Sequence, residues 1–153
     1  MPCKNKFFVL SDIARSEEMS PARLATLSDD ELLERVQRQT FRFFWEAAHP
    51  VSGLVPDRRP AGKGQGNDLV ATGGSGFALM VLVVAVERRW ISREQALERL
   101  GAMLDVLGRA SCYHGALPHF LDGRTGATLP FSRKDDGGDL VETSFLCMGL
   151  LAA

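Results

Sequence analysis

The sequence contains few cysteines, no long apolar run and almost no net charge. Each of these three features excludes a class of protein. Its three cysteines, Cys3, Cys112 and Cys147, lie far apart and match no zinc-ligand spacing, so we expect free thiols. The longest apolar run, Phe77 to Val86, has ten residues, whereas a helix needs about 20 to cross a bilayer. A net charge of −1 provides no electrostatic attraction to nucleic acid. We therefore expect no disulfide framework, no membrane partner and no nucleic-acid partner.

The first residues do not form an export signal. Lys4 and Lys6 precede only four apolar residues, Phe7 to Leu10, and no small-residue cleavage site follows them. The predicted location is therefore cytoplasmic, or periplasmic if the start of the chain is misassigned.

The length and composition indicate one folded domain. The chain has 153 residues, of which 45% are hydrophobic and 24% charged, which suffices for a core. Residues 1–27 show no sustained periodicity and are interpreted as a loosely ordered lead-in, whereas residues 28–153 are interpreted as one domain. Leu150 to Ala153 lie in an apolar helical run without a cap, glycine or proline, so the domain is expected to be truncated there.

Local signals predict helices and one hairpin. Ser28 with Glu31, and Ser92 with Gln95, have the spacing of capping boxes. The turn sequence Asp122 to Gly126 predicts a short hairpin between residues 114 and 131. The predicted helices comprise residues 28–48, 72–90, 93–110 and a fourth that begins near Asp139.

The first helix has a dense aromatic cluster that allows two interpretations. Its apolar face is predicted from Leu32, Leu33, Val36, Phe43 and Phe44, with Phe41 beside them. Packing in the core is one role for the aromatic residues, and stacking on sugar rings is the other. The segment from Val51 to Thr72 is rich in glycine and proline and is predicted as a long loop.

The segment from Pro130 to Phe145 is the strongest candidate for chemistry. It holds four carboxylates, Asp135, Asp136, Asp139 and Glu142, within eight positions. If a helix begins near Asp139, Asp139 and Glu142 lie on one face at its positive end. A capped helix beside a solvated loop explains the same pattern, and an oxygen-ligand calcium site is a further alternative, although the spacing is not that of an EF-hand.

Three stretches together resemble a known family. They read LSDDELLERVQRQTFRFFWEAAHPVSGLVPDR, DLVATGGSGFALM and YHGALPHFLDGRTGATLPFSRKDDGGDLVETSFLCMGLLAA. They are similar to the glucoamylase-like family of bacterial glycoside hydrolases, which includes endo-β-1,2-glucanases and domains related to cyclic β-1,2-glucan synthases. The similarity extends from Leu27 to Ala153. It implies an all-α fold, the N-terminal portion of an (α/α)6 toroid with one short β-hairpin.

The resemblance implies hydrolysis of a bacterial β-glucan with β-1,2 linkages, without a cofactor or metal. Asp139 and Glu142 are its leading catalytic candidates, with Asp135 next, as a water-activating base or an acceptor for sugar hydroxyl groups. A pair on one helical turn lies closer than the roughly 6.5–9.5 Å of an inverting enzyme, which predicts another essential carboxylate outside this chain. The candidates for sugar binding are Asp136, Arg58, His119, Trp45 and Tyr113, followed by Thr72 and Phe131.

Two alternatives stay open at this point. His119 is either a sugar-binding residue or a structural, hydrogen-bonded histidine, since it lacks metal-ligand partners at a known spacing. The chain as a whole is either catalytic or an inactive, truncated glycan-binding fragment. In both cases a partial toroid leaves apolar helix faces uncovered, which predicts self-association.

Overall fold

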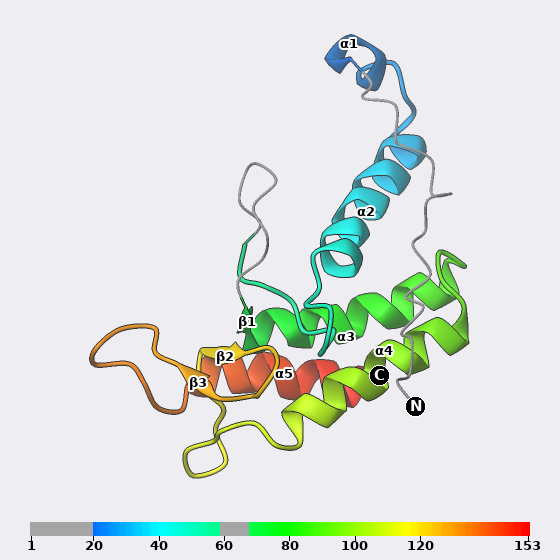
Figure 1. Ribbon diagram of the computed structural model, residues 1–153. Coiled ribbons are helices and arrows are strands. Elements are labelled where there is room, and N and C mark those ends of the chain that lie inside the picture. The colour runs from blue at the N-terminus through cyan, green and yellow to red at the C-terminus, as the bar shows by residue number, and fades with distance from the viewer. Residues whose placement is uncertain (1–19, 59–67) are drawn as a thin grey trace. The chain divides into compact units, whose positions relative to one another are not determined.

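A computed structural model describes residues 20–58 and 68–153 of the chain. The chain divides into two compact units, with the division after Gln37. Most of the predicted lead-in, residues 1–19, lies outside the described residues. Figure 1 shows the helices and strands along the chain.

The first unit contains a short helix and the beginning of a long one. Helix α1, Pro21–Leu24, is capped by the side chain of Ser20. Helix α2, Asp29–Glu46, begins with the predicted capping box, in which Glu31 accepts the N–H of Ser28 at 3.0 Å. The predicted apolar face of α2 is partly wrong, because Leu32, Leu33 and Val36 are exposed.

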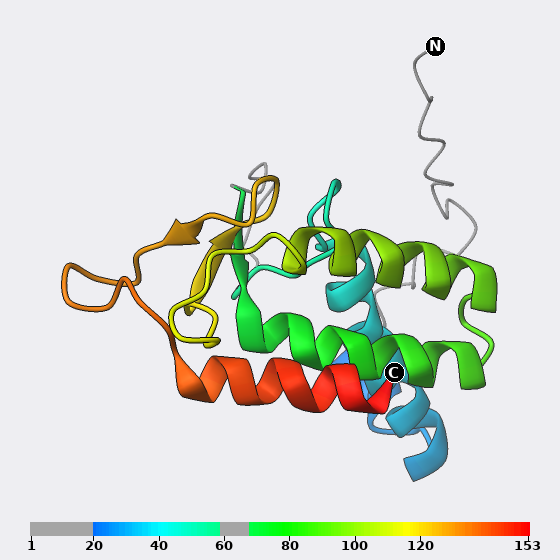
Figure 2. The same cartoon turned by 90° about the horizontal axis from the view of Figure 1, so that it is seen from below.

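Three helices make up most of the second unit. They are α3, Thr72–Glu87, α4, Arg93–Leu107, and α5, Leu140–Ala152. Helix α3 packs against both α4 and α5, and Figure 2 shows that α3 and α5 run in the same direction while α4 runs in the opposite one. Because α3 and α5 are packed together and run in the same direction, their N-terminal ends lie together.

The second capping box is also confirmed, because Ser92 and Gln95 exchange both of its hydrogen bonds at the start of α4.

Helices α3 and α5 approach each other through two glycines. A Cβ atom on Gly76 would overlap the carbonyl oxygen of Phe145, and one on Gly149 would overlap the carbonyl oxygen of Gly76. Side chains at these positions would push the helices apart. Helix α3 is buried through Ala78, Leu79 and other residues but leaves Val83 and Val84 exposed.

The described helices do not include one that is both long enough and apolar enough to cross a membrane. This agrees with the length of the longest apolar run, residues 77–86, most of which lies in the interior of α3.

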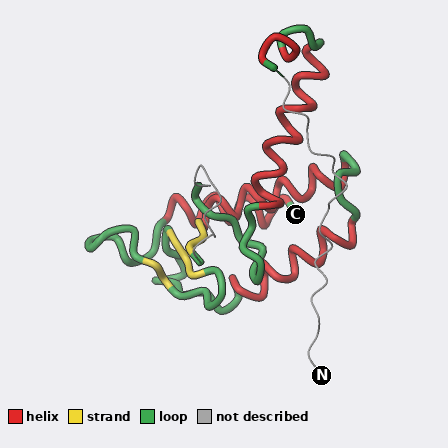
Figure 3. The backbone as a smooth tube through the Cα atoms, turned by 45° about the horizontal axis from the view of Figure 1, so that its top comes forward, coloured by secondary structure: helices red, strands yellow, loops and turns green. Residues whose placement is uncertain are grey.

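A small antiparallel sheet lies among the loops at one end of these helices, as Figure 3 shows. Its strands are β1, Leu69–Ala71, β2, Phe120–Asp122, and β3, Thr128–Leu129, in the order β1-β2-β3. The predicted hairpin is confirmed by β2 and β3. Strand β1 was not predicted, because the segment from Val51 to Thr72 reads as loop. It forms because Val70 pairs with Leu121, about 50 residues later in the chain.

The core of the second unit joins the helices to the sheet. Its fully buried side chains include Leu54, Val55, Leu79, Met103, Leu121 and Leu146. The aromatic cluster of α2 takes part through Phe41, which is 4% exposed, with its ring 5.3 Å from that of Trp90 and 5.8 Å from that of Trp45. The interpretation of this cluster as core packing is therefore confirmed for Phe41.

Candidate active site

Asp139 forms the cap of α5, as the sequence predicts. Its Oδ1 atom accepts the backbone N–H groups of Val141 at 2.9 Å and Glu142 at 3.0 Å. The N–H of Glu142 lowers the pKa of Asp139, and His119 and the N–H of Val141 add to this lowering, whereas burial opposes it. Asp139 is thus held in its ionised form at the positive end of a helix.

His119 contacts the other carboxylate oxygen of Asp139. Its Nδ1 atom lies 3.1 Å from Oδ2 of Asp139. Because an ionised carboxylate only accepts hydrogen bonds, Nδ1 is the donor and Nε2 is left to contact other groups. The imidazole ring also packs against Phe120 and Phe131, with ring centroids 4.4 Å and 4.6 Å away. These contacts support a fixed orientation for His119.

Asp135 lies beside this pair. One ligand atom from each of His119, Asp135 and Asp139 lies within 4.8 Å of the others, and all three residues are half-buried. A nitrogen and two carboxylates form a donor set that transition metals accept. The hydrogen bonds of Asp139 and His119 already occupy three of the available atoms, so the arrangement is equally explained without an ion.

Glu142 points from α5 to the beginning of α3. Its Oε2 atom accepts the backbone N–H of Gly73 at 2.7 Å, a contact between residues 69 positions apart. Together with His119, Asp135 and Asp139, it forms what we call the acidic site. The four residues lie where α3 and α5 both begin, so two helix N-termini contribute partial positive charge there.

The segment before β2 is tied to both helices. Thr72 donates its side-chain O–H to the carbonyl of Pro118 at 2.6 Å and its N–H to the carbonyl of His119 at 3.1 Å. Leu117 donates its N–H to the side chain of Thr143 at 2.9 Å. These bonds hold the backbone on both sides of His119 against the beginnings of α3 and α5. Thr72, a candidate for sugar binding, is buried with its hydroxyl group used in this way.

Two exposed aromatic side chains lie in the loops around the acidic site. Tyr113 is 63% exposed and Phe131 is 55% exposed. Tyr113 belongs to a tight turn that closes through Ala116, and a Cβ atom on Gly138 would lie 2.8 Å from the Cβ atom of Ala116. The loop of residues 130–138 and this turn are therefore in contact. The exposed rings of Phe131 and Tyr113 are available to a ligand.

The other predicted site residues have different surroundings. Trp45 is stacked on Phe41 and lies under Arg99, 4.3 Å from its ring, so its described contacts are with the core. Arg58 is 85% exposed and pairs with its neighbour Asp57 at 2.7 Å. Asp136 is exposed. Sugar binding by these three residues stays a prediction.

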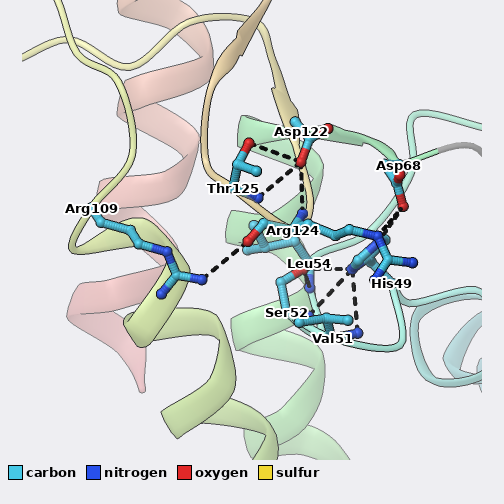
Figure 4. A network of polar contacts seen from close by, with 9 residues as sticks. All are labelled: His49, Val51, Ser52, Leu54, Asp68, Arg109, Asp122, Arg124 and Thr125. Carbon is cyan, nitrogen blue, oxygen red and sulfur yellow. Dashed lines mark hydrogen bonds and ion pairs between the residues drawn. The ribbon is translucent and has the colours of Figure 1, made fainter.

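Sequence reasoning did not identify a second polar network, centred on His49 (Figure 4). Its Nδ1 atom accepts the N–H groups of Val51 and Ser52, each at 3.3 Å, so its proton is on Nε2, which lies 3.0 Å from Asp68. Asp68 also pairs with Arg124 at 3.2 Å. His49 is 6% exposed and Ser52 is fully buried. This network joins the segment after α2 to the residue before β1 and to the turn after β2, and its one sequence signal was the helix end predicted at His49 and Pro50.

Comparisons with known proteins support the predicted resemblance. An exo-β-1,2-glucooligosaccharide sophorohydrolase (non-reducing end) of Parabacteroides distasonis is 44% identical over 147 residues, or 95% of this chain and 20% of the relative. The solved endo-β-1,2-glucanase of Chitinophaga pinensis, in complex with sophorotriose and glucose, is 49% identical, with a TM-score of 0.77 over 82% of this chain and 31% of that one. A solved β-1,2-glucanase of Parabacteroides distasonis is 48% identical, with a TM-score of 0.75.

No protein-family model matches the chain. The chain spans 20% of the curated relative and 18–31% of the two solved chains. A mostly helical structure with one small sheet, matched over this share, is the structure expected of one portion of a larger α/α toroid.

Proposed function

Since this chain is homologous to the glucoamylase-like glycoside hydrolases of bacteria, we propose that it forms part of the active site of an enzyme that hydrolyses β-1,2-linked glucan. Hydrolysis breaks the glycosidic C–O bond and forms a bond from the sugar carbon to the oxygen of water. One carboxylic acid protonates the leaving oxygen, and one carboxylate either activates the water or attacks the carbon.

The gathering of the acidic site at two helix N-termini is the observation that carries this proposal. Asp135, Asp139 and Glu142 come from one segment, whereas His119 and Gly73 come from distant parts of the chain. Exposed Tyr113 and Phe131 offer flat apolar faces of the kind that sugar rings stack on. A capped helix beside a solvated loop would need neither these half-buried contacts nor these aromatic groups.

The contacts support different roles for the three carboxylates. Both oxygens of Asp139 are used, by α5 and by His119, which suits a residue that orients its neighbours. Glu142 has one oxygen bound to Gly73 and one available. The carboxylate of Asp135 makes no hydrogen bond within the described part of the chain, so it is the best placed to contact sugar or water.

Release of reducing sugar from β-1,2-glucan by a chain with the full length of the relatives, with α-1,4-glucan in parallel, tests the proposal. We expect release from β-1,2-glucan alone. Asp135→Asn and Glu142→Gln should each lower the rate by roughly 100-fold or more, as expected when a proton-transfer or positioning carboxylate is lost. Asp105→Asn, which neutralises an exposed carboxylate on α4, serves as the matched control. Equal rates on both glucans, or an unaffected Asp135→Asn variant, would argue against the proposal.

A non-catalytic glycan-binding fragment is the second candidate. The observation that favours it is that the chain spans only 20% of the curated relative, while Val83, Val84 and Leu151 leave apolar helix surface exposed. Calorimetric titration with β-1,2-linked oligosaccharides separates the two candidates. The fragment interpretation would be supported if this chain binds the oligosaccharides without releasing reducing sugar. A chain with the full length of the relatives should then hydrolyse them.

A further inference from the structure

Helix α3 does not supply its own N-terminal cap. The residue at the cap position is Ala71, which has no side-chain acceptor, and the structure has no side-chain cap bond from it. The first N–H groups of a helix lack partners within the helix and need acceptors from elsewhere. The carbonyl of His119 accepts the N–H of Thr72, and the carboxylate of Glu142 accepts the N–H of Gly73.

A Cβ atom on residue 73 would displace the Glu142 carboxylate from this contact. A Cβ atom on Gly73 would lie 2.8 Å from Oε2 of Glu142, 3.1 Å from its Cδ atom and 3.2 Å from the Cβ atom of Phe145. Gly73 is buried and lies in an ordinary helix, so its φ angle gives no reason for glycine. The Glu142 carboxylate therefore keeps this position against the backbone because residue 73 has no Cβ atom.

The neighbouring glycine lacks this constraint. A Cβ atom on Gly74 would have ordinary contacts, 3.4 Å from the Cβ atom of Ala71 and 3.5 Å from a methyl group of Val55. Both glycines lie in the first turn of α3, and alanine would raise helix propensity equally at both. Gly74→Ala is thus a matched control for Gly73→Ala.

We propose that Gly73 is a positioning residue, which holds the carboxylate of Glu142 in one orientation for the reaction. The backbone of α5 fixes one end of the Glu142 side chain, and the N–H of Gly73 fixes its Oε2 atom, so that Oε1 alone faces a ligand. The role of Glu142 in hydrolysis rests on the proposed function, whereas the contact itself does not. A misplacement of about 1 Å in such a group can lower a rate by roughly 100-fold.

The kinetic test compares variants of a chain with the full length of the relatives, with β-1,2-glucan as the substrate. We expect Gly73→Ala to lower kcat by roughly 10- to 100-fold with KM changed less than about 3-fold, and Gly74→Ala to leave both within about 2-fold. In a variant that already carries Glu142→Gln, Gly73→Ala should lower kcat little further, because both changes act on the same carboxylate. Equal kcat values for the two alanine variants, or additive losses in the double variant, would overturn the proposal.

An activity-independent test uses the Gly73 amide of the chain itself. In Glu142→Ala, which cannot clash, the Gly73 N–H should exchange with solvent roughly 10- to 100-fold faster, as expected for a lost bond to a charged group. The N–H of Gly123, bound to the carbonyl of Asp68 at 2.6 Å, is the internal control and should not change. Unchanged exchange at Gly73 would refute the contact. If a chain with the full length of the relatives is inactive but shows the expected exchange, the proposed function is refuted and the contact is confirmed.

Discussion

At the scale of single residues, the charge of Asp139 links the acidic site to pH. Its folded pKa is lowered, first by the N–H of Glu142 and then by His119 and the N–H of Val141. A lowered folded pKa means that the stabilisation is complete above the unfolded pKa, about 4, and is lost as the pH falls through the folded value. The site is therefore most firmly held at neutral pH.

Asp139→Asn tests this charge, because asparagine also caps helices well but cannot ionise. We expect the variant to be less stable than the wild type by roughly 0.3–1 kcal/mol at pH 7, the usual range for a charge at a helix N-terminus. The difference should shrink between pH 5 and pH 2, as the wild type loses its charge. Urea unfolding across this range measures it. Asp68 and Asp122 also have lowered pKa values, but both residues are present in the wild type and in the variant. Their contributions therefore cancel in the difference in stability.

His49 is the second residue whose loss should be costly. His49→Ala would leave the buried N–H group of Ser52 and the half-buried N–H group of Val51 without this acceptor, and Asp68 without its histidine donor. Unpaired buried polar groups cost about 1–3 kcal/mol, and we expect a loss of that size in the free energy of unfolding. His114→Asn, at an exposed position with a φ of 50° that asparagine tolerates, is the control. An equal effect of both variants on the unfolding midpoint would contradict the importance of this network.

At the scale of elements, the close packing of α3 against α5 depends on glycines at the contact, Gly76 and Gly149, which have no side chains. Gly149→Ala would place a Cβ atom against the carbonyl of Gly76, and overpacking of this kind costs about 1–3 kcal/mol. Gly101→Ala, in α4, meets no atom within 4 Å and should instead stabilise by roughly 0.5–1 kcal/mol. Thermal unfolding of the two variants should therefore shift in opposite directions. A shift in the same direction would mean that the helices are not held this closely.

The elements also differ in how well they could be predicted. The starts of α2, α4 and α5 were predicted from Ser28, Ser92 and Asp139, because a cap and its partner lie within three residues of each other. Strand β1 was missed, since its partner strand lies about 50 residues away and its three residues carry no local signal.

At the scale of the whole molecule, the exposed apolar residues of α3 predict self-association of the chain. Val83 and Val84 are 45% and 48% exposed, and burying such residues against a second copy would stabilise a dimer. Sedimentation of the wild-type chain should depend on concentration, and Val84→Lys should weaken association roughly 10-fold. Glu87→Gln, on the same helix with the same change in charge, is the control. A wild-type chain that stays monomeric at all concentrations would contradict this prediction.

The sequence alone determined what depends on neighbouring residues and on composition. It predicted the helical class, the capping boxes, the turn after Asp122, the cap at Asp139 and the resemblance to β-1,2-glucan hydrolases. Only the tertiary structure placed His119 on Asp139, brought Glu142 to Gly73 and built the network of His49. These contacts join residues 19 to 69 positions apart. No local pattern encodes them, because they exist only when packing of the helices and pairing of the strands bring those positions together.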